Sequence, residues 1–439
     1  LELCREKIVI VGGILAICAF NELAELYSNV VFNTGEGETN IHSLLRLAHI
    51  SLNIESFKQL IRKHVVSNVC FYDECHNEIY CSERSVCNLE IQPFSEHNKL
   101  ADVICNNGLV RMETSRGCPW NKCTFCIMPW KYCGEAWRSF SNEKIEQEIK
   151  YLVQNGAIRL WFTDEDFVGN YEHICNLCCI INRCTLEIGY PILFGGSTSV
   201  LTLLKLGSNL DTCLQKMYDA GIVYLFIGIE SGCDSQLMRY NKGVSAYMNE
   251  ELIKKLQQYK FEIDYGFIMF DADTTMKELE ENLKFIDRAG LRNTISRFAK
   301  KLRVTPHTVF YHEYLSRNLI VSGLNINELD YEYIFCDSMI DLIYFYVKKL
   351  DQHILKESYK LQALVRSTIS EKEKKVVYIR LQHLRGCGYR FLINCVNQYN
   401  KNGMLLREDV SDIYEEILKE AVVNQCELGL SQSLCKPSD

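Results

Sequence analysis

The strongest constraint on the fold is a regular alternation of strand-like apolar runs and helical patterns between residues 110 and 310. A strand followed by a crossover helix and another strand places parallel strands side by side and covers them with helices. Six such units predict an α/β fold built on a partial (β/α)6, TIM-like barrel. The strand-like runs are 109–113, 158–162, 192–194, 224–228, 265–270 and 294–298.

The regions that flank this alternation have different patterns. Apolar runs at 7–13 and 29–33, followed by a helical stretch at 41–47, predict a small parallel α/β unit. Beyond residue 310 the pattern becomes mostly helical. We therefore expect four parts: a truncated Rossmann-like unit at 1–64, a connector at 65–109, the partial barrel at 110–310, and a helical C-terminal region at 311–439 that caps the substrate site.

Composition restricts the partners and the compartment. The 439 residues carry a net charge of -8 with no dense basic run, so we expect no nucleic-acid partner. No apolar segment reaches the ~20 residues of a membrane span, so we expect no membrane partner. The 22 cysteines follow a charged start that is unlike a signal peptide, which favours reduced, mostly buried thiols in a cytoplasmic protein. Leu1 in place of Met indicates a missing N-terminal stretch or a non-standard start.

Three cysteines are concentrated directly after the first strand of the alternation. Cys118, Cys123 and Cys126 lie within nine residues. Three thiolates can bind three irons of a [4Fe–4S] cluster and leave the fourth iron open to another ligand. The alternatives are a zinc site or a chance grouping, but structural zinc usually takes four ligands in two pairs. The pattern therefore favours a cluster.

This motif resembles that of the radical S-adenosylmethionine (SAM) superfamily, although its first gap is one residue longer than the usual C-x3-C-x2-C. The flanking Arg116-Gly-Cys-Pro resembles the subgroup in which a cobalamin-type domain precedes the barrel. The resemblance covers roughly residues 1 to 310. It implies a [4Fe–4S] cluster, SAM, a flavodoxin- or ferredoxin-type electron donor, and a 5′-deoxyadenosyl radical that removes hydrogen from a substrate.

The resemblance also implies a SAM site along the carboxyl ends of the strands. Carboxylates after the second strand would meet the SAM ammonium group, hydroxyls after the third would meet its carboxylate or ribose, and a Gly-Ile-Glu-Ser-Gly turn follows the fourth. An exposed acidic turn, a flexible loop and core packing are the alternatives for these elements. The candidate cofactor-binding residues are Phe125, Asp164, Glu165, Asp166, Ser197, Ser199, Glu230, Ser231 and Phe267.

The N-terminal unit resembles the later strands of a cobalamin-binding Rossmann domain. The residues concerned are 10–13 and 34–38. Only the closing portion of such a domain is recognisable, and the Asp-x-His-x-x-Gly ligand motif is absent from the sequence. Cobalamin binding therefore stays possible, but the pattern favours a structural or substrate-recognition role.

The remaining cysteines include one candidate catalytic residue. Cys387 lies between two glycines and beside Arg385 and Arg390, which predicts an accessible, thiolate-capable Cys in a turn, with an ordinary loop Cys as the alternative. Cys395 is the second choice, in surroundings that suggest burial. Two further groups could bind an auxiliary cluster or zinc, although burial is favoured: Cys70, Cys75, Cys81 and Cys87, and Cys175, Cys178, Cys179 and Cys184 with His173.

The subgroup with a degenerate N-terminal unit includes maturases of ribosomally made peptides, notably proteusin-type epimerases. That resemblance implies a precursor-peptide substrate whose α-hydrogen is removed, with Cys387 returning hydrogen to the opposite face. The alternatives are a cobalamin-dependent radical SAM methyltransferase and a metal-stabilised binding protein without enzymatic activity. A tRNA-modifying methylthiotransferase would need a basic RNA-binding module, and the sequence has a pI of about 5.8.

Overall fold

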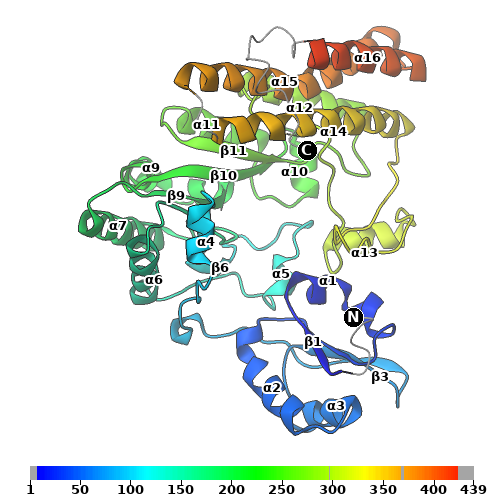
Figure 1. The fold of residues 1–439 in the computed structure, drawn as a ribbon. Helices are drawn as coiled ribbons and strands as arrows, with labels where there is room; N and C mark the ends of the chain where they lie inside the picture. The colour runs from blue at the N-terminus through cyan, green and yellow to red at the C-terminus, as the bar shows by residue number, and fades with distance from the viewer. Residues whose placement is uncertain (1–6, 296, 367–369, 424–439) are drawn as a thin grey trace, which may run out of the picture.

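The computed structural model describes residues 7–295, 297–366 and 370–423. An α/β unit at the N-terminus, drawn in blue in Figure 1, lies below a second sheet with its helices, and long helices lie above that sheet. No helix in the described part of the chain combines the length and the apolar character that crossing a bilayer requires.

The N-terminal unit is a four-stranded sheet of order β1-β2-β3-β4 with helices on both faces. β1 and β2 are parallel, and β3 and β4 continue the sheet antiparallel. Val30 and Phe32 face α1, whereas Val31 faces α2 and α3, as the twofold alternation of a strand requires. The elements are β1 (Val9–Val11), α1 (Gly13–Ala24), β2 (Val30–Asn33), η2 (Gly37–Thr39), α2 (Ile41–Ile50), α3 (Ile54–Lys63), β3 (Val69–Asp73) and β4 (Glu78–Cys81).

The β3–β4 hairpin differs from the expectation of an irregular connector with unpaired cysteines. Cys70 and Cys81 are direct partners in the antiparallel register, and the structure joins them in a disulfide with a Cα–Cα distance of 4.2 Å. Antiparallel pairing places opposite side chains close together, so two cysteines in register meet without further rearrangement. The other two cysteines of this group stay free, Cys75 exposed and Cys87 buried.

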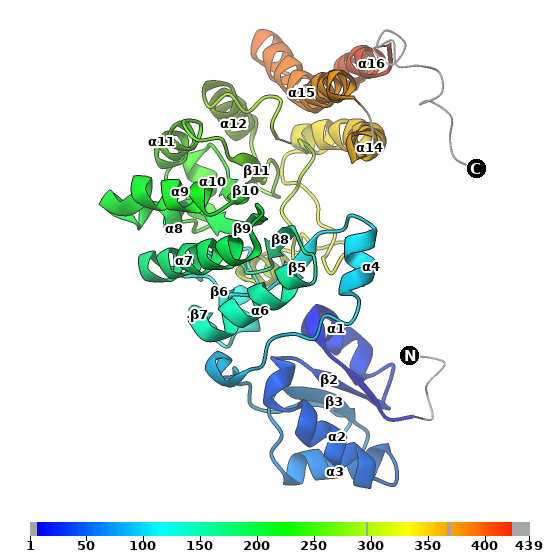
Figure 2. The ribbon, with the colours of Figure 1, turned by 60° about the vertical axis from the view of Figure 1, so that its left-hand side comes forward.

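The second sheet is parallel throughout, with the order β11-β10-β9-β8-β5. Helices cover one of its faces, as Figure 2 shows. Along β10, Leu225, Ile227 and Ile229 are buried beneath these helices, whereas Phe226 and Glu230 lie half-buried on the open face. Strands and covering helices are β5 (Val110–Met112), α6 (Asn142–Gln154), β8 (Arg159–Phe162), α7 (Tyr171–Ile188), β9 (Leu193–Ser199), α9 (Leu210–Asp219), β10 (Ile222–Glu230), α11 (Ala246–Leu256), β11 (Glu262–Phe267) and α12 (Met276–Arg288).

This arrangement confirms the α/β fold with a partial barrel, but the expected sixth strand does not form in the described residues of 294–298. Ile295 and Phe298 are buried, so their apolar character serves core packing and not a strand ladder. Only an isolated bridge between Phe270 and Lys301 continues the parallel direction. The edge of β11 is therefore bordered by a loop.

Short elements connect these parts, and three long helices close the described chain. The short elements are η3 (Leu89–Ile91), α4 (Leu100–Cys105), β6 (Ser115–Gly117), α5 (Met128–Lys131), β7 (Trp137–Ser139), α8 (Val200–Leu204), η4 (Gly207–Asn209), α10 (Asp234–Arg239) and α13 (Val309–Ser316). The long helices α14 (Ser338–Arg366), α15 (Glu371–Asn402) and α16 (Arg407–Val423) pack on one another, and α15 also packs on α12.

Cys387 lies in the middle of α15, so the prediction of an accessible thiol in a turn is wrong. Its side chain is 0% exposed, and burial raises the pKa of its thiol. The flanking glycines permit close packing: a Cβ on Gly388 would lie 2.8 Å from the Cβ of Phe298, and one on Gly386 would lie 2.5 Å from the Oδ1 of Asn293. Cys395 is buried in the same helix, as expected.

One buried carboxylate joins the two α/β parts. Glu36, which follows β2, accepts hydrogen bonds from Arg116 Nη1 on β6 (2.8 Å) and Arg138 Nη2 on β7 (3.0 Å). Its other oxygen accepts from the backbone N–H of Cys87 at 2.7 Å. Burial opposes ionisation of Glu36, but the bonds from Arg138 and Arg116 outweigh it and hold its pKa below 4.5. The carboxylate is therefore charged and fully bonded at neutral pH.

We expect Glu36→Gln to lower the free energy of unfolding by about 3 kcal/mol, because it leaves two partly buried guanidinium groups without their common counter-ion. Glu38→Gln is the matched control. Glu38 also pairs with Arg116, at 2.8 Å, but its side chain is 36% exposed, so the loss should stay below about 1 kcal/mol. Urea unfolding measures both, and equal losses would contradict the role given to Glu36.

The same pair predicts a pH dependence. A carboxyl group whose folded pKa lies below its unfolded value stabilises the protein above the unfolded value, here 4.5, and this contribution is lost as the pH falls. The difference in stability between the native protein and Glu36→Gln should therefore shrink below pH 4.5. A difference that stays constant from pH 7 to pH 3 would show that the charge of Glu36 does not contribute.

Candidate functional site

Three thiols meet in the segment between β6 and α5. Burial is the main cause of a raised pKa at each, to about 12 for Cys123 and about 11 for Cys126. Cys118 also receives backbone N–H groups of Trp120 and Asn121. The charge of Cys118 raises the pKa of Cys123 and of Cys126, so the three thiols lie near one another.

Hydrogen bonds attach this cysteine loop, residues 118–126, to the segment that follows α10. Trp120 Nε1 donates to the carbonyl of Asn241 at 2.7 Å, and the Asn241 side chain donates back to the carbonyl of Lys122 at 2.8 Å. The N–H of Thr124 donates to the carbonyl of Tyr240 at 3.1 Å. The loop position is therefore fixed by residues more than 110 positions away in the sequence.

The same segment places a buried lysine next to the thiols. Lys242 Nζ pairs with Glu230 Oε1 at 3.1 Å and lies 6.0 Å from the ring centroid of Phe125. Its charge lowers the pKa of all three cysteines. Gly228 makes room for this pair, because a Cβ there would lie 2.4 Å from Glu230 Oε1.

Lys242 is a functional candidate that the sequence reasoning did not assign. Its signal is a lysine twelve residues after Glu230, in a segment with few other charges. A cationic side chain that is 6% exposed needs a nearby counter-charge, and Glu230 and the thiols are the groups that supply it. A cluster with three thiolate ligands would add negative charge at this position.

The donor set fits a [4Fe–4S] cluster. Three thiols lie near one another, the sulfur of Cys118 receives backbone N–H groups, and the buried ammonium group of Lys242 supplies positive charge. In the described ranges, no three or more His, Cys, Asp and Glu side chains are arranged to hold a single metal ion. A four-iron cluster instead needs thiols that reach three different irons.

Two of the predicted carboxylates are buried within the protein. Asp164 accepts from the backbone N–H of Thr114 (2.9 Å) and the hydroxyl of Ser115 (2.7 Å), and burial raises its pKa to about 7. Asp166 accepts from the hydroxyls of Thr198 (2.9 Å) and Thr202 (2.6 Å). Both carboxylates tie neighbouring strand ends together.

The third carboxylate faces the cysteine loop. Glu165 accepts from the backbone N–H of Gly117 (2.9 Å), from Lys131 Nζ (2.8 Å) and from the Tyr132 hydroxyl (2.8 Å). Gly117 has a φ of +90°, and a Cβ there would lie 2.0 Å from the carbonyl oxygen of Ala136. Glu165 therefore braces the strand end from which the loop starts. A role of these three carboxylates in SAM binding stays a prediction.

The other predicted residues divide between the two faces of the sheet. Ser197 lies half-buried on the open face, and Ser199 caps the N-terminus of α8 by accepting from the N–H of Thr202. The Ser231 hydroxyl is buried and bonded to Gln236 and Asn282, and the ring of Phe267 packs against Phe285 on the helix side. The structure thus groups the three cysteines, Phe125, Glu230 and Lys242, and sets the other candidates around them.

Comparison with known proteins agrees with this geometry. Residues 112–286 match the model of the radical SAM superfamily. The chain is 25% identical over 296 residues to 4′-phospho-dehydrooxetanocin synthase of Priestia megaterium, covering 64% of this chain and 38% of the relative. It is 27% identical over 223 residues to bacteriochlorophyllide d C-8(2)-methyltransferase of Chlorobaculum tepidum, covering 48% of this chain and 46% of the relative. The chain thus spans less than half the length of either relative.

The fold has a solved counterpart in the cobalamin-dependent S-adenosylmethionine radical enzyme OxsB, whose structure contains aqua-cobalamin and S-adenosylmethionine. The TM-score is 0.81 at 18% identity, over 98% of this chain and 69% of the other. The likeness includes the N-terminal unit as well as the barrel and the C-terminal helices. Members of the superfamily use a [4Fe–4S] cluster and SAM, for which the three-cysteine loop is suited. Residues 112–286 are therefore similar to the radical SAM superfamily, and the three-cysteine loop lies within that segment.

Proposed function

We propose that the chain acts as a cobalamin-dependent radical SAM enzyme that modifies an unactivated carbon of a small organic substrate. One observation carries this proposal: the carboxyl ends of the parallel strands β1 and β2 are fixed directly beside the cysteine loop. Ligands of parallel α/β sheets bind at the carboxyl ends of the strands. A ligand bound there would lie next to the cluster site.

Packing and hydrogen bonds hold the two parts in this relation. Ile17 and Cys18 of α1 pack against Ile127, at the end of the cysteine loop. Arg84 donates to the carbonyls of Thr34, after β2, and Trp130, in α5, at 2.8 and 2.6 Å. The Arg84 guanidinium also stacks on Trp130, 3.5 Å from the ring centroid. These contacts, with the Glu36 pairs, make the strand ends and the loop neighbours.

The residues at the carboxyl end of β1 fit one wall of a cobalamin site. Gly12, Gly13 and Ile14 are exposed there, and a Cβ on Gly13 would meet no atom within 4 Å. A backbone without side chains beside an apolar residue can approach a flat macrocycle closely. The sequence analysis favoured a structural role for this unit, whereas its exposed glycine edge supports binding.

The chemistry follows from the cofactors that this site would hold. A bound, reduced [4Fe–4S] cluster would supply the electron that cleaves the sulfonium bond of SAM, and cobalamin would supply a transferable methyl group or a further redox centre. The chain itself positions and shields these groups. Cys118, Cys123 and Cys126 would bind the cluster, Lys242, held by Glu230, would supply positive charge beside it, and the bond from Trp120 to Asn241 holds the loop in position.

The first test removes single cluster ligands. Each of Cys118→Ala, Cys123→Ala and Cys126→Ala should lose most of the bound iron and all SAM cleavage after anaerobic reconstitution, because only three protein ligands are available. Cys105→Ala is the control, since Cys105 is exposed at the end of α4. Iron analysis and detection of 5′-deoxyadenosine measure the outcome. If a variant of Cys118, Cys123 or Cys126 kept the native iron content and the native rate of SAM cleavage, other cysteines would bind the cluster.

The second test concerns cobalamin. The reconstituted chain should retain about one hydroxocobalamin through gel filtration, and Ile14→Glu should reduce retention at least tenfold by placing a charge on the proposed wall. Leu26→Glu is the matched control, because Leu26 is also exposed but follows the opposite end of α1. The visible spectrum of the eluted protein gives the ratio. Equal retention by both variants, or none by the native chain, would overturn the cobalamin proposal.

Peptide epimerisation is the second candidate, and it rests on the family resemblance. It requires a hydrogen donor that faces the substrate, and Cys387 is buried in α15 with Arg390 Nη2 at 3.1 Å from its sulfur. The burial of Cys387 therefore removes the proposed hydrogen donor on which this reaction depended. A precursor-peptide substrate, a flavodoxin- or ferredoxin-type donor and a cytoplasmic location remain proposals that accompany the resemblance.

A further inference from the structure

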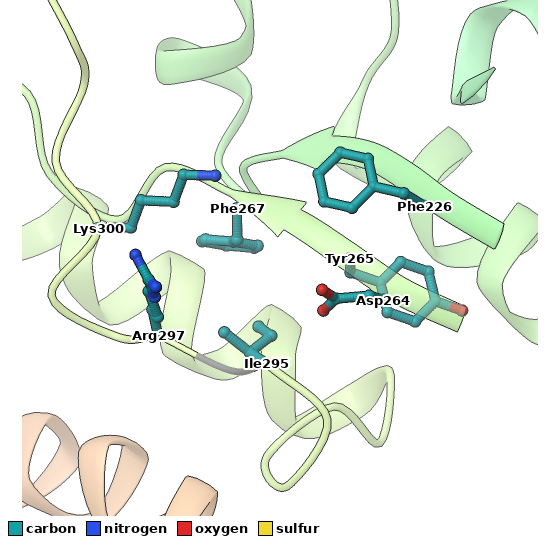
Figure 3. Close-up of a pocket in the computed structure, with 7 residues that line it drawn as sticks. All are labelled: Phe226, Asp264, Tyr265, Phe267, Ile295, Arg297 and Lys300. Atoms are coloured by element: carbon teal, nitrogen blue, oxygen red, sulfur yellow. The ribbon is translucent and has the colours of Figure 1, made fainter. Parts of the chain in front are cut away.

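A cavity of about 240 Å³ lies at the free edge of β11 (Figure 3). Phe226 of β10 and Asp264 of β11 are register partners and form part of its wall. The loop that replaces the sixth strand contributes Arg297 and Lys300, whose side chains reach toward the same space as the Asp264 carboxylate. The cavity therefore combines an aromatic surface with charged groups of both signs.

Positive charge predominates around this space. Desolvation raises the pKa of Asp264, and the charges of Arg385, Lys300 and Arg297 act against that rise, so all three cations lie near enough to attract its carboxylate. The Arg297 guanidinium donates to a neutral partner, the hydroxyl of Tyr359, at 3.2 Å. A second nearby acid is Asp351 on α14, whose pKa is raised by burial, and the charge of Arg297 acts against that rise. Its Oδ2 already accepts a hydrogen bond from the backbone N–H of Ala299 at 2.8 Å.

The C-terminal helices hold the cationic loop in place. Asp351 binds its backbone and Tyr359 binds Arg297, both from α14. α15 approaches the loop closely because Gly386 and Gly388 carry no side chain there. The loop backbone and the Arg297 guanidinium therefore have defined positions, which favours a specific ligand over a diffuse attraction.

The cavity shares a sheet face with the cofactor site. Phe226 and Glu230 project to the same side of β10, and four residues of strand separate them, about 13 Å at the usual rise per residue. Glu230 pairs with Lys242 beside the thiols. A small molecule anchored at Arg297 and Lys300 would therefore extend along the open face toward the cluster.

We propose that this cavity binds the anionic group, a phosphate or a carboxylate, of a small-molecule substrate. The inference rests on the proposed function, and it adds the substrate class. A guanidinium fork and an ammonium group together match the geometry and charge of an oxyanion. The volume fits such a group with part of a sugar or a ring, and the Phe226 face is available to that part.

Calorimetric titration of the full chain without cofactors tests this inference, using ribose, ribonate and ribose 5-phosphate as probes. One or both anionic probes should bind at least tenfold more tightly than ribose, and the better one identifies the group. Arg297→Gln combined with Lys300→Gln should remove that preference. Lys301→Gln should keep it, because Lys301 pairs with Glu332 at 2.6 Å instead of facing the cavity.

Asp264→Asn should change the affinity for the anionic probe in the opposite direction. An increase in affinity cannot result from a loss of folding, so this variant distinguishes the two effects. It removes a negative charge from the cavity wall, so affinity for the anionic probe should rise several-fold at pH 7.5. Equal affinities for all three probes, or weaker anion binding by Asp264→Asn with an unchanged melting temperature, would overturn the inference. This titration uses no cluster, SAM or cobalamin, so its result can be interpreted even if the chain does not bind cobalamin.

Discussion

The buried contact of Glu36 with Arg116 and Arg138 determines how the two α/β parts relate. Both arginines lie on the β6–β7 hairpin, whose strands precede and follow the cysteine loop. The same contact that joins the N-terminal unit to the barrel therefore also orients the loop. Removing Glu36 would take the shared counter-ion from two partly buried guanidinium groups, which costs more than losing a surface ion pair.

A second set of contacts fixes the loop from the opposite side. The backbone of residues 239–241 receives and donates hydrogen bonds along it, and Lys242 follows directly in the chain. Because the lysine is adjacent to the residues that hold the loop, its charge and the thiol positions are set by one short segment. The loop that carries the three thiols is therefore held by hydrogen bonds from a distant part of the chain.

Local patterns in the sequence predicted the elements whose causes are local. The apolar runs that became β5, β8, β9, β10 and β11, and the spacing of Cys118, Cys123 and Cys126, needed no knowledge of distant contacts. The failures have non-local causes. Glycines beside Cys387 permit either a turn or close helix packing, and the partner that decides is Phe298, about ninety residues earlier. The burial of Asp164 likewise could not be predicted locally, because its donors, Thr114 and Ser115, lie about fifty positions away.

The missing sixth strand has a consequence for how such a molecule can change over generations. A strand in that place would be bound to its neighbour through backbone hydrogen bonds, and each of its inward side chains would be tied to the register of the sheet. The loop of residues 297–300 is instead held at a few points, by Asp351 and Tyr359 of α14 and by the backbone N–H of Met269, which donates to the carbonyl of Lys300. Charge changes at its exposed positions Arg297 and Lys300 would leave the sheet and the cysteine loop intact. In the proposed enzyme, substrate choice can therefore change independently of the cluster site.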